Sequence, residues 1–194
     1  MAVQHLGPRI CITGIPTAGK STLAQNIADE TNGIVLATDV IRKELVTNPI
    51  YEPWVNFYRE KDPYEYYTNT NPKEQWKTLY DQSVNIWPGI LEVINHYKDE
   101  QKLVIVEGVS ALPELIHRDL GWPCLVLVNN SLEETHRRNK IKPRWGIKDP
   151  ETLLLNSKGF YSIEGPEYIK QAKEFGYPVF DNNEAARKYI LKTL

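Results

Sequence analysis

The chain has 194 residues, of which 41% are hydrophobic and 25% are charged. These values are ordinary for a globular protein and exclude a fibrous chain or one that is disordered throughout. The formal net charge of −2 gives no overall attraction to polyanions, so a nucleic-acid partner would need a local basic patch. Residues 1–9 contain no apolar segment typical of a signal peptide. No stretch is long and apolar enough to span a bilayer. We therefore expect a cytoplasmic protein of one domain, with no membrane partner.

Five short runs rich in β-forming residues, each bounded by turn residues, predict the strands of one sheet. Three of the runs are almost continuously apolar, as is typical of strands that helices cover on both faces, and this favours a parallel sheet in an α/β architecture. The sequence also predicts that Cys11 and Cys124, which lie in apolar runs without CxxC spacing, are buried and reduced. The predicted strands are residues 9–13, 33–37, 103–107, 124–129 and 177–180.

Helical patterns fall between these strands. In residues 73–97, apolar side chains recur every three or four positions, which predicts a long helix that Pro88 should kink or divide. Residues 48–71 are rich in Tyr, Asn and Pro, and we interpret them as an insertion over the sheet edge rather than a separate domain. The other predicted helices are residues 21–30, 39–46, 132–140, 167–175 and 184–191, the last capped by Asn182 or Asn183.

Residues 14–22 read GIPTAGKST and match every fixed position of the phosphate-binding motif GxxxxGKS, between a predicted strand and a predicted helix. In such a loop, backbone N–H groups converge on the β-phosphate and the helix N-terminus adds partial positive charge. Lys20 is expected to bridge the β- and γ-phosphates, and the Ser21 hydroxyl to bind Mg²⁺. A chance glycine turn would not need Gly, Lys and Ser in this order. The residues predicted to bind ATP here are Gly14, Ile15, Pro16, Thr17, Ala18, Gly19, Lys20, Ser21 and Thr22.

An acidic residue, Glu107, ends the third predicted strand and gives it the form of a Walker B strand. Ligands of open α/β folds bind at this edge of the sheet. Glu107 is therefore expected to hold the magnesium ion, directly or through a water molecule, because a glutamate replaces the more usual aspartate. The alternative is a strand-end acid in solvent, which is common.

The second predicted strand leads into Asp39, with Arg42 one helical turn later on the same face. A carboxylate at this edge can accept the proton of a hydroxyl, and an arginine can hold an anionic acceptor in line. The competing interpretation is that Asp39 only caps the following helix and that Arg42 is solvated. The neighbouring phosphate-binding loop favours catalysis.

A dense basic patch follows the fourth predicted strand and its helix. We interpret residues 137–150 as a mobile lid that closes on ATP and stabilises charge on the transferred group, with Arg138 and Arg144 as the expected contacts. A solvated helix C-terminus would explain part of the patch equally well. Its members are Arg137, Arg138, Lys140, Lys142 and Arg144.

Ten aromatic residues lie between positions 51 and 87. They suggest aromatic walls around an acceptor site, on which a base or a sugar could stack, within an acceptor-side region at residues 46–98. A small aromatic core that holds the insertion in place is the simpler alternative for most of these rings.

Three segments, GIPTAGKST, TDVIRKEL at residues 38–45 and VIVEGVSALP at residues 104–113, resemble the P-loop domain of 2-phosphoglycerate kinases in order and spacing, over the first two thirds of the chain. The resemblance implies a nucleoside-monophosphate-kinase-like fold: three layers, with a five-stranded parallel sheet of strand order 2-3-1-4-5 flanked by helices. Ser110 stands where that family usually has histidine, and the Tyr-rich insertion is a further departure. By analogy with related kinases, Asp181 and Asn182 would line the adenine pocket, although a turn with a helix cap explains them equally well.

The leading hypothesis is an ATP-dependent kinase that phosphorylates a hydroxyl of a small, anionic acceptor resembling 2-phosphoglycerate. The phosphate-binding loop, the acidic residue and the lid also resemble those of polynucleotide 5′-hydroxyl kinases and zeta-toxin-like kinases. A nucleoside or polynucleotide kinase is therefore the second hypothesis, and nucleic acid is the less favoured partner. The third is a regulatory module that binds ATP and hydrolyses it slowly. The sequence specifies neither the acceptor nor the oligomeric state.

Overall fold

The structure is a computed structural model that describes residues 8–58 and 60–193. The expectation for the N-terminus therefore lies mostly outside the described residues. In the described part, the strands form one parallel sheet in the order β2-β3-β1-β4-β5. The predicted sheet and its strand order are confirmed. Its strands are β1 (Arg9–Gly14), β2 (Ile34–Ala37), β3 (Val104–Glu107), β4 (Cys124–Leu127) and β5 (Val179–Phe180).

The centre of the sheet is almost wholly apolar. In β1, β3 and β4 most side chains are buried, as expected for strands covered on both faces. Cys11 and Cys124 lie opposite each other on β1 and β4, and both are buried free thiols, as predicted. Burial raises the pKa of each thiol. The apolar centre thus holds the polar carboxyl ends of β1, β2 and β3 in fixed positions.

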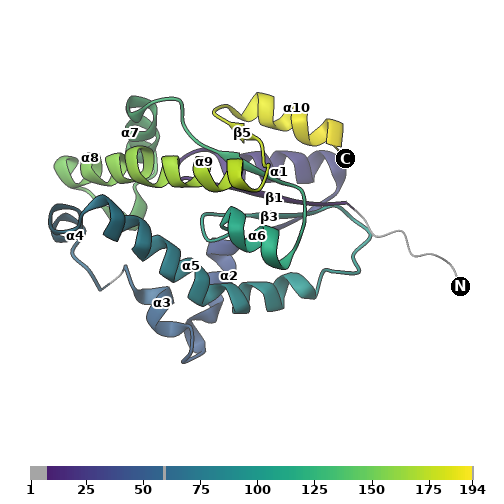
Figure 1. Cartoon of the computed structure of the whole chain (residues 1–194), viewed down its shortest axis with the longest axis horizontal. Helices are drawn as coiled ribbons and strands as arrows, with labels where there is room; N and C mark the ends of the chain where they lie inside the picture. Colours follow the sequence, from purple (N-terminus) through teal and green to yellow (C-terminus); the bar gives the residue numbers. More distant parts are fainter. Residues whose placement is uncertain (1–7, 59, 194) are drawn as a thin grey trace, which may run out of the picture.

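Helices cover the two faces of the sheet (Figure 1). Helices α1 and α10 contact each other on one face, and α5, α6 and α9 pack on the other. Their bounds are α1 (Lys20–Thr31), α5 (Pro72–Asn95), α6 (Pro113–Asp119), α9 (Gly165–Glu174) and α10 (Asn183–Thr193). Within the described ranges, no helix combines the length and the apolar character needed to cross a membrane.

The long helix α5 corrects one expectation. It runs without a break through Pro88, so the predicted division is wrong. A capping box formed by Asn71 and Glu74 fixes its start. Buried Ile86 and Ile90 continue the apolar face on both sides of the proline. Packing on the core therefore holds the helix together despite the hydrogen bond that the proline cannot donate.

The remaining elements lie at the end of the sheet where the candidate site is found. The insertion forms two short helices, α3 and α4, whose main contacts are with helices α5 and α8 rather than with the sheet edge. Helix α8 and the π-helical segment η3 were not predicted. The elements are α2 (Thr38–Glu44), η1 (Leu45–Thr47), α3 (Glu52–Asn56), α4 (Pro63–Asn69), α7 (Leu132–Ile141), η2 (Arg144–Gly146), α8 (Pro150–Lys158) and η3 (Gly159–Glu164).

Candidate active site

The loop between β1 and α1 has a backbone that only glycine can follow at two positions. Gly14 has φ of 122°, and a Cβ atom there would lie 1.9 Å from the carbonyl oxygen of Leu127. Gly19 has φ of 92° directly before the first turn of α1. Lys20 folds back over the loop and donates a hydrogen bond to the Ile15 carbonyl oxygen at 2.6 Å. The loop is therefore an open backbone cradle at a helix N-terminus, which is the arrangement that binds phosphate groups.

Lys20 and Glu107 form the charged floor of this cradle. Both side chains are almost completely buried. Burial lowers the pKa of Lys20 to about 8, while the nearby Glu107 carboxylate opposes this shift. Burial likewise raises the pKa of Glu107, and the Lys20 charge opposes it. The two groups are therefore close enough to stabilise each other's charges in a site of low polarity.

The Ser21 hydroxyl donates a hydrogen bond to Glu107 Oε1 at 2.9 Å. This contact joins the start of α1 to the end of β3 at the carboxyl edge of the sheet. Among the described residues, no cluster of three or more His, Cys, Asp or Glu side chains could hold a metal by itself. The Ser21 hydroxyl and the Glu107 carboxylate are two oxygen ligands that suit Mg²⁺. This ion commonly binds one or two protein oxygens and completes its shell with phosphate oxygens and water.

Asp39 lies in the first turn of α2, between two arginines. Its carboxylate is 3.8 Å from Arg42 Nη2 and 3.7 Å from Arg144 Nη1. The alternative in which Asp39 caps the helix is wrong, because Ala37 occupies the N-cap position and no side chain caps the helix. The carboxylate therefore faces the space beyond the end of β2 rather than the N-terminus of the helix.

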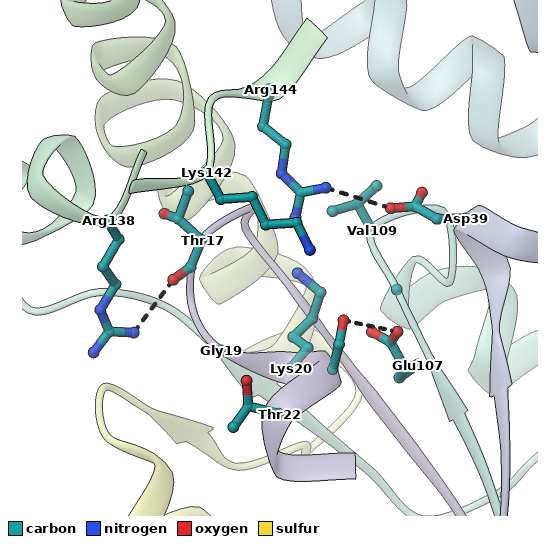
Figure 2. A pocket seen from close by; sticks show the side chains of 12 residues that line it. Thr17, Gly19, Lys20, Thr22, Asp39, Glu107, Val109, Arg138, Lys142 and Arg144 are labelled. Carbon is teal, nitrogen blue, oxygen red and sulfur yellow. Dashed lines mark hydrogen bonds and ion pairs between the residues drawn. The ribbon is translucent and has the colours of Figure 1, made fainter. Parts of the chain in front are cut away.

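Basic side chains from α7 and from the loop after it surround the cradle. Arg138 donates a hydrogen bond to the Thr17 carbonyl oxygen at 3.2 Å and pairs with Glu134 at 2.5 Å. Figure 2 shows the side chains of Lys20, Lys142 and Arg144 converging on the space over the phosphate-binding loop. Arg137 and Lys140 are exposed on α7, as the solvated alternative expects. Helix α7 ends at Ile141, so only the later part of the predicted lid is a loop.

Two hollows meet at this end of the sheet. The first lies over the cradle and encloses about 700 Å³, open solvent included, and we call it the donor hollow. The second, the acceptor hollow, encloses about 540 Å³ on the side of α2 and α5. Asp39, Val109 and Arg144 line both.

The acceptor hollow contains a group that the sequence did not reveal. Glu164, at the end of η3, lines it, and its Oε2 atom is shielded from solvent with no hydrogen-bond partner. Arg42 and Ser110 also line this hollow, and Arg42 Nε and Ser110 Oγ are buried without a partner too. No sequence pattern predicts that a glutamate among residues 150–166 turns inward. The unpredicted π-helical turn, a feature frequent at functional sites, is the structural signal.

Aromatic rings close one wall of the acceptor hollow. The Trp145 ring stacks on Tyr58, with ring centroids 4.5 Å apart, and on Tyr67, with centroids 5.8 Å apart. Trp145 has φ of 56°, a left-handed conformation that bulky residues rarely adopt. Stacking compensates for this strain and holds the adjacent Arg144 over the two hollows. Tyr58 lines the hollow, whereas Tyr66 is buried in the insertion, as the aromatic-core interpretation expects. An aromatic wall around an acceptor stays a prediction.

The two residues predicted to line the adenine pocket lie outside the donor hollow. Asp181 and Asn182 are exposed after β5. Asn182 caps α10 by accepting a hydrogen bond from the backbone N–H of Ala185 at 2.8 Å. The neighbouring Asn183 reaches the phosphate-binding loop instead and donates to the Gly19 carbonyl oxygen at 3.2 Å. The contacts of Asn182 therefore agree with the alternative in which Asp181 and Asn182 form a turn and a helix cap.

Comparisons with solved structures identify the fold. A protein from Thermus thermophilus is 21% identical with a TM-score of 0.61, over 97% of this chain and 98% of that one. A shikimate kinase from Acinetobacter baumannii in complex with shikimate is 17% identical with a TM-score of 0.52, over 98% and 93%. A protein from Chloroflexus aurantiacus is 14% identical with a TM-score of 0.54, over 98% and 100%. No protein-family model matches the sequence, and no curated protein is significantly similar to it. At these identities the likeness establishes the P-loop kinase fold alone.

Proposed function

We propose that this protein is an ATP-dependent kinase that transfers the γ-phosphate of ATP to a hydroxyl of a small acceptor. The observation that carries this proposal is that Asp39 and Arg144 line both hollows. A phosphate held in the donor hollow and a hydroxyl held in the acceptor hollow would meet at a carboxylate and a guanidinium. This pairing is what phosphoryl transfer requires.

The donor hollow fits Mg-ATP. Backbone N–H groups of the loop and Lys20 would hold the phosphates, and Ser21 with Glu107 would hold the magnesium ion. When bound, the ion neutralises charge on the β- and γ-phosphates. Arg138 and Lys142 add positive charge where the triphosphate would extend. The contacts of the adenine ring are left unassigned, because Asp181 and Asn182 lie away from this hollow.

The chemistry follows from the position of Asp39. The acceptor oxygen forms a bond to the γ-phosphorus while the bond from that phosphorus to the bridging oxygen breaks, and ADP leaves with the electron pair. The hydroxyl proton passes to a carboxylate oxygen of Asp39. Arg144 faces the same point and stabilises charge on the transferred group.

The acceptor most in keeping with the second hollow carries an anionic group. Arg42 and Arg144 both line it, and arginine binds carboxylate and phosphate groups through paired hydrogen bonds. The sequence resemblance to 2-phosphoglycerate kinases points to the same class of acceptor. The stacked rings of Tyr58 and Trp145 favour one alternative, a nucleoside or the 5′ end of a polynucleotide, because bases stack on aromatic side chains.

A panel of acceptors tests the proposal. Purified protein is incubated with magnesium and ATP labelled at the γ-phosphate, together with hydroxy acids, phosphorylated acids, sugars, nucleosides or oligonucleotides, and the labelled product is separated and identified. Transfer to a hydroxy acid supports the proposal, and transfer to an oligonucleotide would favour the alternative. Slow ATP hydrolysis that no hydroxyl compound stimulates would instead support a regulatory module and contradict the proposed kinase.

A further inference from the structure

The acceptor hollow contains an acidic group that the proposed transfer step does not use. Glu164 is half-buried, and its Oε2 atom is shielded from solvent without a hydrogen-bond partner. Buried carboxylate oxygens in folded proteins nearly always have a partner, so an unpaired one that lines a hollow beside the phosphate-binding loop points to a group supplied by a ligand.

The unpaired groups of this hollow are complementary to a ligand with two chemically different ends. Arg42 Nε and Ser110 Oγ also lack partners and line the same space. Arg42 can only donate hydrogen bonds, whereas an ionised Glu164 can only accept them. A ligand that binds Arg42 and the ionised form of Glu164 therefore accepts hydrogen bonds at one end and donates them at the other.

Charged and titratable neighbours determine the state of Glu164. Burial raises its pKa to about 7, and the positive charges of Lys20 and Arg144 oppose this shift. Asp39 and Arg42 line the same hollow. The phenols that also face Glu164 stay neutral near pH 7, because burial raises the pKa of each. A ligand that donates a hydrogen bond or carries a positive charge favours the carboxylate form, whereas a second anion is repelled. These phenols belong to Tyr58, Tyr66, Tyr67 and Tyr168.

We propose that Glu164 is a specificity-determining residue that accepts a hydrogen bond from a second polar group of the acceptor, a hydroxyl or an ammonium group. The acceptor class is then a small acid with one anionic group near Arg42, one hydroxyl near Asp39 and one hydrogen-bond donor at Glu164. This inference rests on the proposed kinase function and narrows it. An acceptor with a second anionic group at the Glu164 end, such as the phosphate of 2-phosphoglycerate, is disfavoured.

Four compounds that share one skeleton test this assignment. 3-Hydroxypropionate has a carboxylate and a terminal hydroxyl, and glycerate, serine and 2-phosphoglycerate add a hydroxyl, an ammonium group or a phosphate at the middle carbon. Their dissociation constants are measured by ligand-observed NMR in the presence of ADP. We expect the wild-type protein to bind glycerate or serine about 10-fold more tightly than 3-hydroxypropionate. The tighter ligand donates one more hydrogen bond, to the charged carboxylate of Glu164. We expect 2-phosphoglycerate to bind most weakly. Whether glycerate or serine binds more tightly shows whether Glu164 prefers a hydroxyl or an ammonium group.

Two substitutions separate hydrogen bonding from charge. Glu164→Leu removes both and should abolish the preference for glycerate or serine over 3-hydroxypropionate. Glu164→Gln keeps an accepting oxygen but no charge, so the preference for glycerate should persist while that for serine and the penalty for 2-phosphoglycerate both fall. A single cooperative thermal transition with ADP, at a midpoint no lower than that of the wild type, establishes that each variant is folded.

The same preferences in wild type and Glu164→Leu would overturn the assignment. So would tighter binding of 2-phosphoglycerate than of glycerate by the wild-type protein. A separate transfer assay with labelled ATP distinguishes the two proposals. Binding in the expected order without transfer would contradict the kinase function but would support recognition by Glu164. Transfer that is the same in wild type and Glu164→Leu would support the kinase function but would contradict recognition by Glu164.

Discussion

The donor and acceptor hollows are built in different ways, although they meet at Asp39 and Arg144. The phosphate cradle of the donor hollow is one contiguous loop, residues 14–22, between β1 and α1, and residues from three other segments complete the lining. The acceptor hollow takes its lining from segments between Pro16 and Glu164, spread over most of the chain. A contiguous phosphate cradle can be recognised as a motif, whereas an assembled pocket depends on how distant elements pack. We therefore expect the two halves to respond differently to substitution.

The largest expected effect is on the donor half. Lys20→Met should reduce phosphate transfer by about 10³-fold or more, because it removes the buried charge that we propose contacts the β- and γ-phosphates. Binding of glycerate in the acceptor hollow, measured by NMR without nucleotide, should change little. Lys142→Met is the matched control, since this exposed lysine lines the same hollow and should have a much smaller effect. Loss of glycerate binding in Lys20→Met would show that the halves are not separable.

A smaller effect is expected on the acceptor half. Trp145→Ala removes the ring that stacks on Tyr58 and Tyr67 and should misplace Arg144, lowering kcat/KM for the acceptor by roughly 10- to 100-fold. Trp145→Phe should restore most of the activity because it retains an aromatic ring. Ile141→Ala, which shortens a highly exposed side chain of the same basic segment, should have no effect. Equal activity of Trp145→Ala and wild type would show that stacking does not position Arg144.

The smallest expected effect concerns stability. The pKa of Glu164 is about 7 in the folded protein and near 4.5 in the unfolded chain, so the folded state binds more protons between these values. The stabilisation from this proton is complete below pH 4.5 and is lost as the pH rises through 7. As the pH rises from 5 to 8, the free energy of unfolding of Glu164→Gln should therefore increase by about 1 to 3 kcal/mol relative to that of the wild type.

Urea unfolding at several pH values measures this difference without any ligand. Glu92→Gln, at an exposed position of α5, is the control and should leave the pH dependence of stability unchanged. A parallel pH dependence for wild type and Glu164→Gln would contradict the burial of an ionisable Glu164. The expected stability cost of this acid is typical of groups retained for function rather than for folding.

The sheet and the donor half could be predicted because their signals are local. Continuous apolar runs identified the buried strands, and Gly14, Gly19, Lys20 and Ser21 identified the phosphate-binding loop, in which both glycines have positive φ angles. Helix α8 was missed because its buried face is partly polar. Asn139 donates hydrogen bonds to Asn156 at 2.7 Å and to Ser157 at 3.0 Å inside the protein. An apolar periodicity cannot reveal a face that hydrogen bonds hold together.

The acceptor half could be predicted only in part. Asp39 and Arg42 were found because they follow a strand that ends at the same edge of the sheet as the phosphate-binding loop. The contact between Asp39 and Arg144 joins residues more than a hundred positions apart and depends on the packing of Trp145. The inward position of Glu164 follows from the π-helical turn between α8 and α9. Such placements are tertiary, so local sequence does not determine them.

The most direct test of a kinase site shared by the two hollows is the comparison of Asp39→Asn with wild type for both ATP binding and phosphate transfer. ATP affinity is measured by calorimetry with magnesium, and transfer by labelled product from the best acceptor of the panel. We predict that ATP affinity is retained while transfer falls by about 10²- to 10⁴-fold, because the hydroxyl proton loses its acceptor. Transfer at the wild-type rate in Asp39→Asn would contradict the account, since the carboxylate that joins the two hollows would then have no part in the reaction.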